Sequence, residues 1–396
     1  MMKTRRVARA ARAGVMIGAC LLGLASGARA LTTSDNPASI LIWPKIVVGG
    51  DVDTLIDISN LNQDGKLVAA HCWLIDASGD ECSAIDFDIY ITQNQPLAWR
   101  ASEGMRDFPR PFRGLCSGTT IPCDPTAPWS GPCPASSTCQ DAQGNAGSLI
   151  PPVPSMPFVG ALKCTQYNAT TDIPEQGSLA NSLIGHASIV TVSPDGGRVV
   201  GADVERYNAV GIRHLNAHSF DGTLKLDGDQ YAQCPAVLIL DHPFDGAPLL
   251  ADDTDVPVYG STLTDLTLVP CGDDFLRDKP GQAVAQILVF NEFEQRLSAS
   301  KPIKCFYESP LSLIDTSYPE RSIFSYKVQG TVAGQTLIKG SGSAATGNGL
   351  VGIARTSAGT YAPGSGGNFG AFGSSAAYGL DQRGTKPGTA DTIWTR

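Results

Sequence analysis

Three histidines of this sequence have side chains suited to binding one metal ion together. His214 and His218 are four positions apart, so they would share a face on either a helix or a strand. His242 could add a third nitrogen ligand for zinc or copper. Nothing in the sequence shows that these segments meet, so solvated surface histidines are the simpler interpretation.

A run of oxygen-bearing residues matches the start of a calcium-binding loop. Asn60, Asn62, Asp64 and Gly65 occupy its first, third, fifth and sixth positions. The twelfth position holds His71, where the loop needs a glutamate that binds through both oxygens. Asn, Asp and Gly also favour tight turns, so we prefer a hairpin turn here. We therefore predict no tightly bound metal and no cofactor.

Two carboxylates could support acid–base catalysis. Asp86 and Asp88 would project from one strand face about 7 Å apart, a spacing compatible with an inverting glycosidase. The same alternation is typical of any strand with one face in water. His71 and Cys72 cannot act as a pair, because neighbouring side chains of a strand point to opposite faces. No Gly-x-Ser-x-Gly, His-Glu-x-x-His or phosphate-binding glycine loop occurs, so a non-catalytic protein is favoured.

The first thirty residues have the pattern of a cleavable signal peptide. A basic start is followed by the apolar residues 14–24 and by small residues at Ala28 and Ala30. The apolar run continues beyond Cys20, which argues against a lipoprotein. We predict cleavage after Ala30 and export to the periplasm, the cell surface or the medium. The mature chain contains no second apolar run of transmembrane length.

Ten cysteines remain in the mature chain, and an even number in an exported protein favours disulfides. They are Cys72, Cys82, Cys116, Cys123, Cys133, Cys139, Cys164, Cys234, Cys271 and Cys305. The four between residues 116 and 139 lie in a segment rich in Pro, Gly and Ser, and we expect them to pair among themselves. A zinc site is the alternative, but it usually needs two close cysteine pairs, and the gaps here are six, nine and five residues. Cys72 and Cys82 flank a turn and could close it, or either could reach a distant strand.

The charge of the mature chain limits its partners. Without the six basic residues of the leader, 23 basic and 38 acidic residues remain, a net charge of −15. Such a surface repels phosphate backbones and anionic lipid, so binding to nucleic acid or to a membrane surface is disfavoured. The 42% of hydrophobic residues is sufficient for a sizeable core.

Short alternating segments predict an all-β fold. In residues 85–92 the four apolar side chains Ile85, Phe87, Ile89 and Ile91 fall on one face. Further strands are predicted at residues 39–48, 54–59, 67–75, 187–192, 237–240, 262–269, 283–291, 299–306 and 335–339. Only residues 203–208 and 311–315 look helical. This pattern favours an antiparallel β-sandwich architecture, as one large or two abutting sandwiches.

Two segments depart from this pattern. The predicted β-sandwich region, residues 31–339, is interrupted at residues 103–157 by an insertion with eleven prolines and four cysteines. We expect bridges and prolines, rather than a core, to hold this insertion, and long segments of this kind are often binding elements. Residues 340–396 are rich in Gly and Ser. Within them, residues 340–375 favour a flexible linker that is interrupted by a strand at residues 350–354. Their β-prone end, residues 390–396, could dock as a final strand.

Two strings near the start of the mature chain, Ile42 to Val48 and Asp53 to Asn60, resemble the first strands of exported bacterial β-sandwich proteins that have no assigned activity. Strings at residues 158–164, 207–212 and 266–271 are similar to the same group. The resemblance implies an exported β-sandwich protein and supplies no active-site residue.

Three classes of function remain open. We favour a non-catalytic exported protein with a structural or adhesive role at or outside the cell envelope, which would contact a surface protein or a glycan through the insertion. A carbohydrate-binding module is the second class, with Trp43, Trp99, Trp129 and Trp394 as stacking platforms. A hydrolase whose site is not visible in the sequence is the third. The sequence does not determine the oligomeric state.

Overall fold

Strands dominate the computed structural model: of the residues that it describes, 66% are in strands and 6% in helices, so the protein is all-β. The structure describes residues 32–33, 36–62, 68–79, 82–106, 115–116, 139–140, 149–168, 173–177, 181–195, 198–216, 223–248, 261–341, 349–361, 369–371, 376–385 and 391–395. Residues Leu31–Arg396 form one compact unit.

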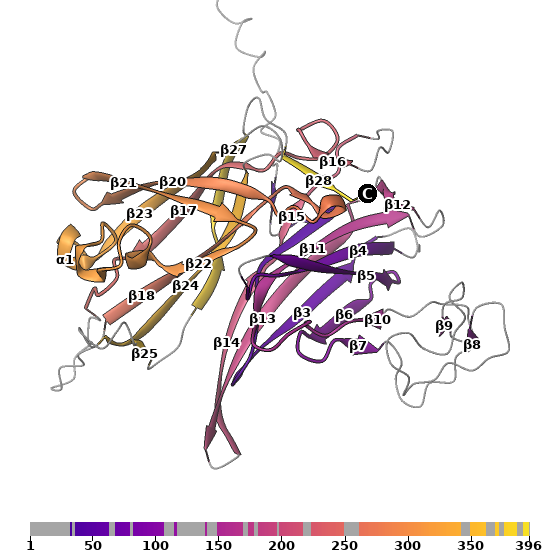
Figure 1. Ribbon diagram of the computed structural model, residues 1–396, viewed down its shortest axis with the longest axis horizontal. Coiled ribbons are helices and arrows are strands. Elements are labelled where there is room, and N and C mark those ends of the chain that lie inside the picture. Colours follow the sequence, from indigo (N-terminus) through magenta and orange to yellow (C-terminus); the bar gives the residue numbers. More distant parts are fainter. Residues whose placement is uncertain are drawn as a thin grey trace, which may run out of the picture. The chain divides into compact units, whose positions relative to one another are not determined.

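The N-terminal half supplies two large sheets (Figure 1). The first, in spatial order, is β1 (Thr32–Thr33), β15 (Val210–Ile212), β2 (Ile40–Val48), β11 (Phe158–Asn168), β4 (Val68–Asp76) and β5 (Ser83–Ile91), with β12 (Ile173–Gly177) also paired to β11. The second is β14 (Arg198–Asn208), β13 (Leu183–Asp195), β3 (Val52–Asn60) and β6 (Pro96–Arg100). We call them the seven-stranded and the four-stranded blade.

The C-terminal half supplies three more sheets. The three-stranded blade is β16 (Thr223–Leu226), β28 (Asp391–Trp394) and β19 (Asp273–Asp274). The β20 blade is β21 (Arg296–Lys304), β20 (Gln282–Asn291), β23 (Ala333–Ser341), β17 (Pro235–Pro243) and β27 (Asp381–Thr385). The β18 blade is β22 (Tyr307–Pro310), β18 (Ser261–Pro270), β24 (Leu350–Tyr361) and β25 (Phe369–Ala371), with β26 (Ala376–Gly379) paired to β24.

The remaining elements are short. They are the paired strands β7 (Met105–Arg106) and β10 (Leu149–Ile150), the paired strands β8 (Leu115–Cys116) and β9 (Cys139–Gln140), the 3₁₀ helices η1 (Phe275–Arg277), η2 (Leu311–Leu313) and η3 (Pro319–Arg321), and the helix α1 (Tyr326–Gln329). No helix among the described residues is long and apolar enough to cross a membrane.

The predicted β-sandwich is wrong, because the sheets form a five-bladed β-propeller arrangement. Alternation along a strand shows only that one of its faces is buried. It does not show whether that face meets one opposite sheet or a ring of neighbours. The strands of a blade are also not consecutive: β2 lies between β11 and β15, which follow it at a long distance in the chain.

Three apolar cores join the blades. The core between the seven-stranded and four-stranded blades includes Trp43, Ile58, Cys72, Cys164 and Ile189. The core between the β20 and β18 blades includes Leu240, Ile287, Leu266 and Ala354. A third core lies between the opposite face of the seven-stranded blade and the three-stranded blade, and includes Ile40, Ile42, Leu224, Cys271 and Ile393. The seven-stranded blade is therefore covered on both faces.

Most predicted strands occur with small shifts of their ends. Residues 85–92 form β5, where Ile89 and Ile91 are buried in the first core and Ile85 and Phe87 pack against it. Residues 311–315 begin with η2, as predicted. The predicted helix at 203–208 is wrong, because these residues belong to β14, which pairs with β13 along its length. There Glu205 and Tyr207 are buried and their neighbours are exposed, a two-residue period that a short helical assignment cannot explain.

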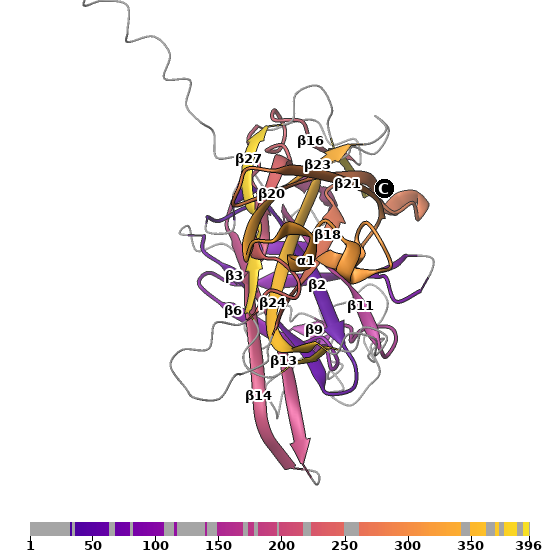
Figure 2. The ribbon, with the colours of Figure 1, turned by 90° about the vertical axis from the view of Figure 1, so that its left-hand side faces the viewer.

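The hairpin of β13 and β14 is longer than its blade. The two strands pair as far as Asp195 and Arg198, whereas β3 follows β13 only to Thr191. Figures 1 and 2 show this hairpin running beyond the neighbouring strands.

Candidate functional site

A cavity of about 640 Å³ opens at the turn between β2 and β3. This volume lies within the range of ligand pockets in proteins. Its walls come from the β2–β3 turn, from β13 and from the segments that enter and leave the insertion, and comprise residues 48–53, Leu55, Arg100, Ser102, Met156, Pro157, Val190 and Val192.

Two glycines of the β2–β3 turn line this cavity. Gly49 and Gly50 have positive φ angles, 147° and 57°, which residues with a Cβ rarely adopt. A Cβ on Gly49 would also lie 2.9 Å from Cβ of Pro157. The backbone carbonyl of Asp51 accepts a hydrogen bond from the Val192 amide at 2.8 Å. The turn is therefore held against both β13 and the end of the insertion.

The polar edge of the cavity joins β3 to the start of the insertion. The Asp53 carboxylate accepts hydrogen bonds from the amide and the hydroxyl of Ser102, at 3.2 and 2.6 Å. Arg100 and Glu103 form an exposed ion pair at 4.0 Å, with side chains 64% and 70% accessible. Arg100 is thus a cation at the cavity rim that solvent can reach.

Both ends of the insertion are part of the fold, which differs from the expectation that no core holds it. Ile150 and Val153 are buried in the first core, and the Val153 amide donates to the carbonyl of Ala101 at 2.9 Å. Strands β7 and β10 pair through Met105 and Ile150. Within the described residues, the insertion therefore closes at its base like a hairpin, next to the cavity.

A second group of side chains lies where three blades meet, and we call it the junction cluster. It comprises Lys45, Glu205, Asp265, Glu308 and Arg355, from β2, β14, β18, β22 and β24. Lys45 donates to Glu308 at 2.5 Å and Arg355 to Glu205 at 2.6 Å. Burial raises the pKa of Asp265, and the charge of Lys45 opposes this shift.

The junction cluster was missed in the sequence, where its members are scattered over more than three hundred residues. The sequence held one signal: Asp265 lies between Thr264 and Leu266, in a run of residues that are mostly apolar or carry a hydroxyl group. A carboxylate in such a strand indicates either a solvent-facing position or a buried pair. Each cation here has a carboxylate partner, so the cluster joins blades by charge.

The structure brings His71, Asp86 and Asp88 together. The imidazole Nδ1 lies 2.8 Å from Asp88 Oδ1, and Nε2 lies 3.5 Å from Asp86 Oδ2. One imidazole thus lies between the two carboxylates, on the face of β4 and β5 that also carries Trp73, and none of the three residues lines the cavity. On the same face, burial raises the pKa of Tyr167, and its hydrogen bond to Tyr90 acts in the same direction.

The three histidines have different surroundings. His214 packs its ring against Tyr231, with centroids 4.9 Å apart. His242 is buried on β17, where its ring nitrogens contact the Pro243 carbonyl at 2.9 Å and the Thr336 hydroxyl at 2.8 Å. His218 lies outside the described residues. Across the described part of the chain, no group of three or more His, Cys, Asp or Glu residues is arranged to hold a metal ion.

The residues of the proposed calcium loop form a turn where they are described. Asn60 is buried at the end of β3, and its amide donates to the Ile91 carbonyl at 3.1 Å. Its side-chain oxygen accepts the Asn62 amide at 2.9 Å. Asp64 and Gly65 lie outside the described residues. The Asn60 side chain therefore ties β3 to β5. The hairpin predicted at this position is wrong, because β3 pairs with β13 and β6, whereas β4 pairs with β11 and β5 in another sheet.

Three disulfides are present among the described residues: Cys72–Cys164, Cys82–Cys305 and Cys234–Cys271. Neither Cys72 nor Cys82 closes the local turn, and each reaches a distant strand or loop. The backbones of β8 and β9 place Cys116 opposite Cys139. Cys123 and Cys133 lie outside the described residues. Disulfides of this number are consistent with an extracellular or periplasmic protein.

The tryptophans differ in accessibility. Trp43 and Trp99 are 0% and 5% exposed in the first core, so neither is a platform for a sugar ring. Trp394 is half-buried, and the Arg277 guanidinium lies 5.3 Å from its ring centroid. Trp129 lies outside the described residues.

Comparison with known proteins gives no match to a family model or to a curated protein sequence. The resemblance of residues 42–60 to exported bacterial proteins therefore stays a prediction.

Asp245 and His242 are buried, and we expect pH to change their contributions to the free energy of unfolding in opposite directions. Burial raises the pKa of Asp245 from 3.8 to about 7, so its contribution is greatest at low pH and is lost as pH rises to about 7. Burial lowers the pKa of His242 from 6.5 to about 4, so its contribution is present above about pH 6.5 and is lost as pH falls to about 4. Between about pH 7 and pH 4, each group changes the free energy of unfolding by about 3–4 kcal/mol, and the two changes largely cancel.

We expect single variants to separate these effects. Asp245→Asn should lose about 3 kcal/mol more stability than the wild type when pH falls from about 7 to 4, because His242 is then unopposed. His242→Gln should gain about 3 kcal/mol relative to the wild type over the same change. Urea unfolding at several pH values measures both. Parallel pH profiles for the wild type and the two variants would contradict the assignment.

Proposed function

We propose that the protein is a non-catalytic exported binding protein that acts at or outside the cell envelope, and that it recognises its ligand at the cavity beside the insertion. One observation carries the proposal: the segments that enter and leave the insertion both form walls of this cavity. A ligand in the cavity would therefore contact the fixed β2–β3 turn and the base of the insertion at once.

The cavity walls support binding to an apolar group. Leu55 and Met156 are 38% and 62% exposed there, and Val190 and Val192 add further apolar surface. Most wall residues belong to paired strands or to the tied β2–β3 turn, so little conformational entropy would be lost there on binding. Arg100 at the rim, beside Glu103, can donate hydrogen bonds to a ligand that carries a hydrogen-bond-accepting group next to its apolar part.

The two other classes of function, a carbohydrate-binding module and a hydrolase, have less support. Burial of Trp43 and Trp99 removes two of the four platforms on which a carbohydrate-binding module was considered. Asp86 and Asp88 are bridged by His71, and none of the three lines the cavity, which does not favour a hydrolase built on this pair. A surface protein or a glycan with an apolar group remains the partner that we propose.

An apolar anionic dye tests whether the cavity binds such groups. We expect anilinonaphthalene sulfonate to bind the folded mature protein with increased fluorescence, and Leu55→Asp to weaken binding about tenfold, because a carboxylate would face an apolar, negatively charged ligand. Leu313→Asp is the matched control, since Leu55 and Leu313 are each 38% exposed and Leu313 lies on η2, away from the cavity.

Equal dye binding by the wild type, Leu55→Asp and Leu313→Asp would place the apolar site elsewhere and reject the cavity. Unfolding of Leu55→Asp is monitored by its melting transition. Arg100→Gln then serves as a second variant, and it should weaken binding of the sulfonate while leaving the apolar walls unchanged.

A further inference from the structure

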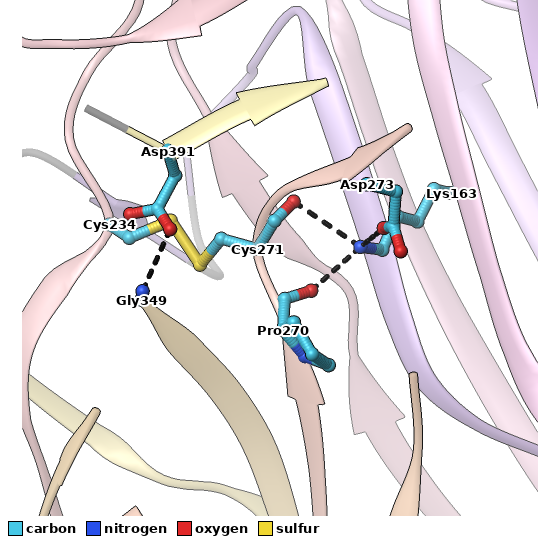
Figure 3. The surroundings of a disulfide bond; sticks show 7 residues. All are labelled: Lys163, Cys234, Pro270, Cys271, Asp273, Gly349 and Asp391. Carbon is cyan, nitrogen blue, oxygen red and sulfur yellow. Dashed lines mark hydrogen bonds and ion pairs between the residues drawn. A yellow bond between two sulfur atoms is a disulfide. The ribbon is translucent and has the colours of Figure 1, made fainter. Parts of the chain in front are cut away.

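An amine and a carboxyl group from distant parts of the chain lie together in the interior. Lys163 is on β11, in the middle of the seven-stranded blade, and Asp273 is on β19 of the three-stranded blade. Their side chains are 1% and 3% exposed. Figure 3 shows the Lys163 Nζ directed at the Asp273 carboxylate, beside the Cys234–Cys271 disulfide.

Backbone groups hold both reactive atoms in place. Nζ of Lys163 contacts Oδ2 of Asp273 and donates to the carbonyls of Pro270 at 2.7 Å and Cys271 at 3.2 Å. Oδ1 of Asp273 accepts the Gly281 amide at 2.8 Å. The two carbonyls orient the amine, and the Gly281 amide polarises the carboxyl group from its opposite side.

Two aromatic residues neighbour this pair, one across the sheet and one along the chain. Trp73 on β4 is directly opposite Lys163 in the sheet, and Phe275 follows Asp273 by two residues. Their rings stack with centroids 4.6 Å apart and planes within 2°. The amine and the carboxyl group themselves are 1% and 3% exposed, so water has little access to them.

Amide formation requires the uncharged forms of both groups. Burial penalises an ammonium and a carboxylate alike, and their attraction rarely compensates for the loss of hydration in full. Burial raises the pKa of Asp273, and the charge of Lys163 acts against this shift. Proton transfer from the ammonium to the carboxylate leaves a free amine and a carboxylic acid, which are the reactants of amide formation.

We propose that Lys163 and Asp273 condense into an intramolecular isopeptide bond. The Nζ lone pair attacks Cγ of Asp273, and the Gly281 amide stabilises the negative charge that develops on Oδ1. The C–Oδ2 bond breaks, and Oδ2 leaves as water with the proton of the acid and one proton of the amine. The resulting amide N–H retains the Pro270 carbonyl as its acceptor. No oxidant, cofactor or second substrate is required.

The bond would add a fourth kind of connection between blades, besides the cores, the ion pairs and the disulfides. It joins β11 of the seven-stranded blade to β19 of the three-stranded blade. Unlike the adjacent Cys234–Cys271 disulfide, it would persist under reducing conditions.

Intact mass spectrometry of the folded mature protein tests the proposal. After reduction and alkylation, we expect a mass lower by one water molecule than the sequence requires. Loss of water at an Asp-Gly pair such as Asp245-Gly246 gives the same mass, so the position must be identified. Tandem mass spectrometry of chymotryptic peptides should show the Lys163 peptide joined to the Asp273 peptide.

Two variants give distinct masses. Lys163→Met removes the nucleophile and should show no loss linked to Asp273. Asp273→Asn should react with loss of one ammonia molecule instead of water, because its leaving group is an amide nitrogen. If either variant fails to fold, the wild-type spectrum still decides the question. Full mass and separate Lys163 and Asp273 peptides from folded wild-type protein would overturn the proposal and leave a buried ion pair.

Discussion

Replacement of Trp43 by alanine should lower the free energy of unfolding by about 3–5 kcal/mol. The side chain is fully buried between the seven-stranded and four-stranded blades. Its indole N–H donates to the His186 carbonyl at 2.9 Å, and a Cβ on Gly185 would lie only 2.2 Å from its ring. Truncation therefore leaves a large cavity and a carbonyl without its donor, and the close strand at Gly185 limits any collapse.

Urea unfolding of Trp43→Ala, Trp43→Phe and Trp394→Ala measures this contribution. Trp43→Phe keeps a ring and should cost less than Trp43→Ala. Trp394 is half-buried and contacts the Arg277 side chain, so Trp394→Ala should cost less than about 2 kcal/mol. A Trp43→Ala protein as stable as the wild type would show that this tryptophan is no part of the core and would reopen its use as a sugar platform.

Loss of the Cys82–Cys305 disulfide should lower stability by about 2–5 kcal/mol. It joins residues 223 positions apart, the longest separation among the three described bridges. In chain-entropy terms, a bridge across a longer segment removes more freedom from the unfolded chain. It also connects the β4–β5 turn of the seven-stranded blade to the end of β21 in the β20 blade.

The double variant Cys82→Ser/Cys305→Ser tests this contribution, with Cys234→Ser/Cys271→Ser as a control for the shorter separation of 37 residues. We also expect Cys82–Cys305 to be reduced first under mild dithiothreitol, because Cys82 is half-buried whereas the four cysteines of the two other described bridges are at most 1% exposed. Mass shifts after alkylation report the order. Simultaneous reduction of all three bridges would contradict an independent opening at Cys82.

The strands of this protein were largely predictable, and their partners were not. The period of two in residues 85–92 reports burial of one face of β5, because side chains alternate across any strand. The partner of β5 is β4, a hairpin neighbour within reach of sequence reasoning. By contrast, β2 pairs with β11 and β15, and no local pattern encodes a contact across more than a hundred residues.

Cysteine pairing shows the same division. An even count in an exported chain predicted disulfides, and three described pairs bear this out. Cys72 and Cys82 are close in sequence on either side of a turn, yet β11 lies beside β4 and places Cys164 directly opposite Cys72. Register between distant strands, rather than spacing along the chain, selects the partner.

The sequence by itself determined the all-β class, the positions of most strands and the occurrence of disulfides, because these depend on local alternation, turn residues and cysteine number. Only the tertiary structure decided that the sheets form five blades, that Trp43 is core, and that the insertion closes beside a cavity. It also brought Lys163 to Asp273 and Lys45 to Glu308. These features depend on which apolar faces meet, and many arrangements bury the same residues equally well until strand register and side-chain packing select one.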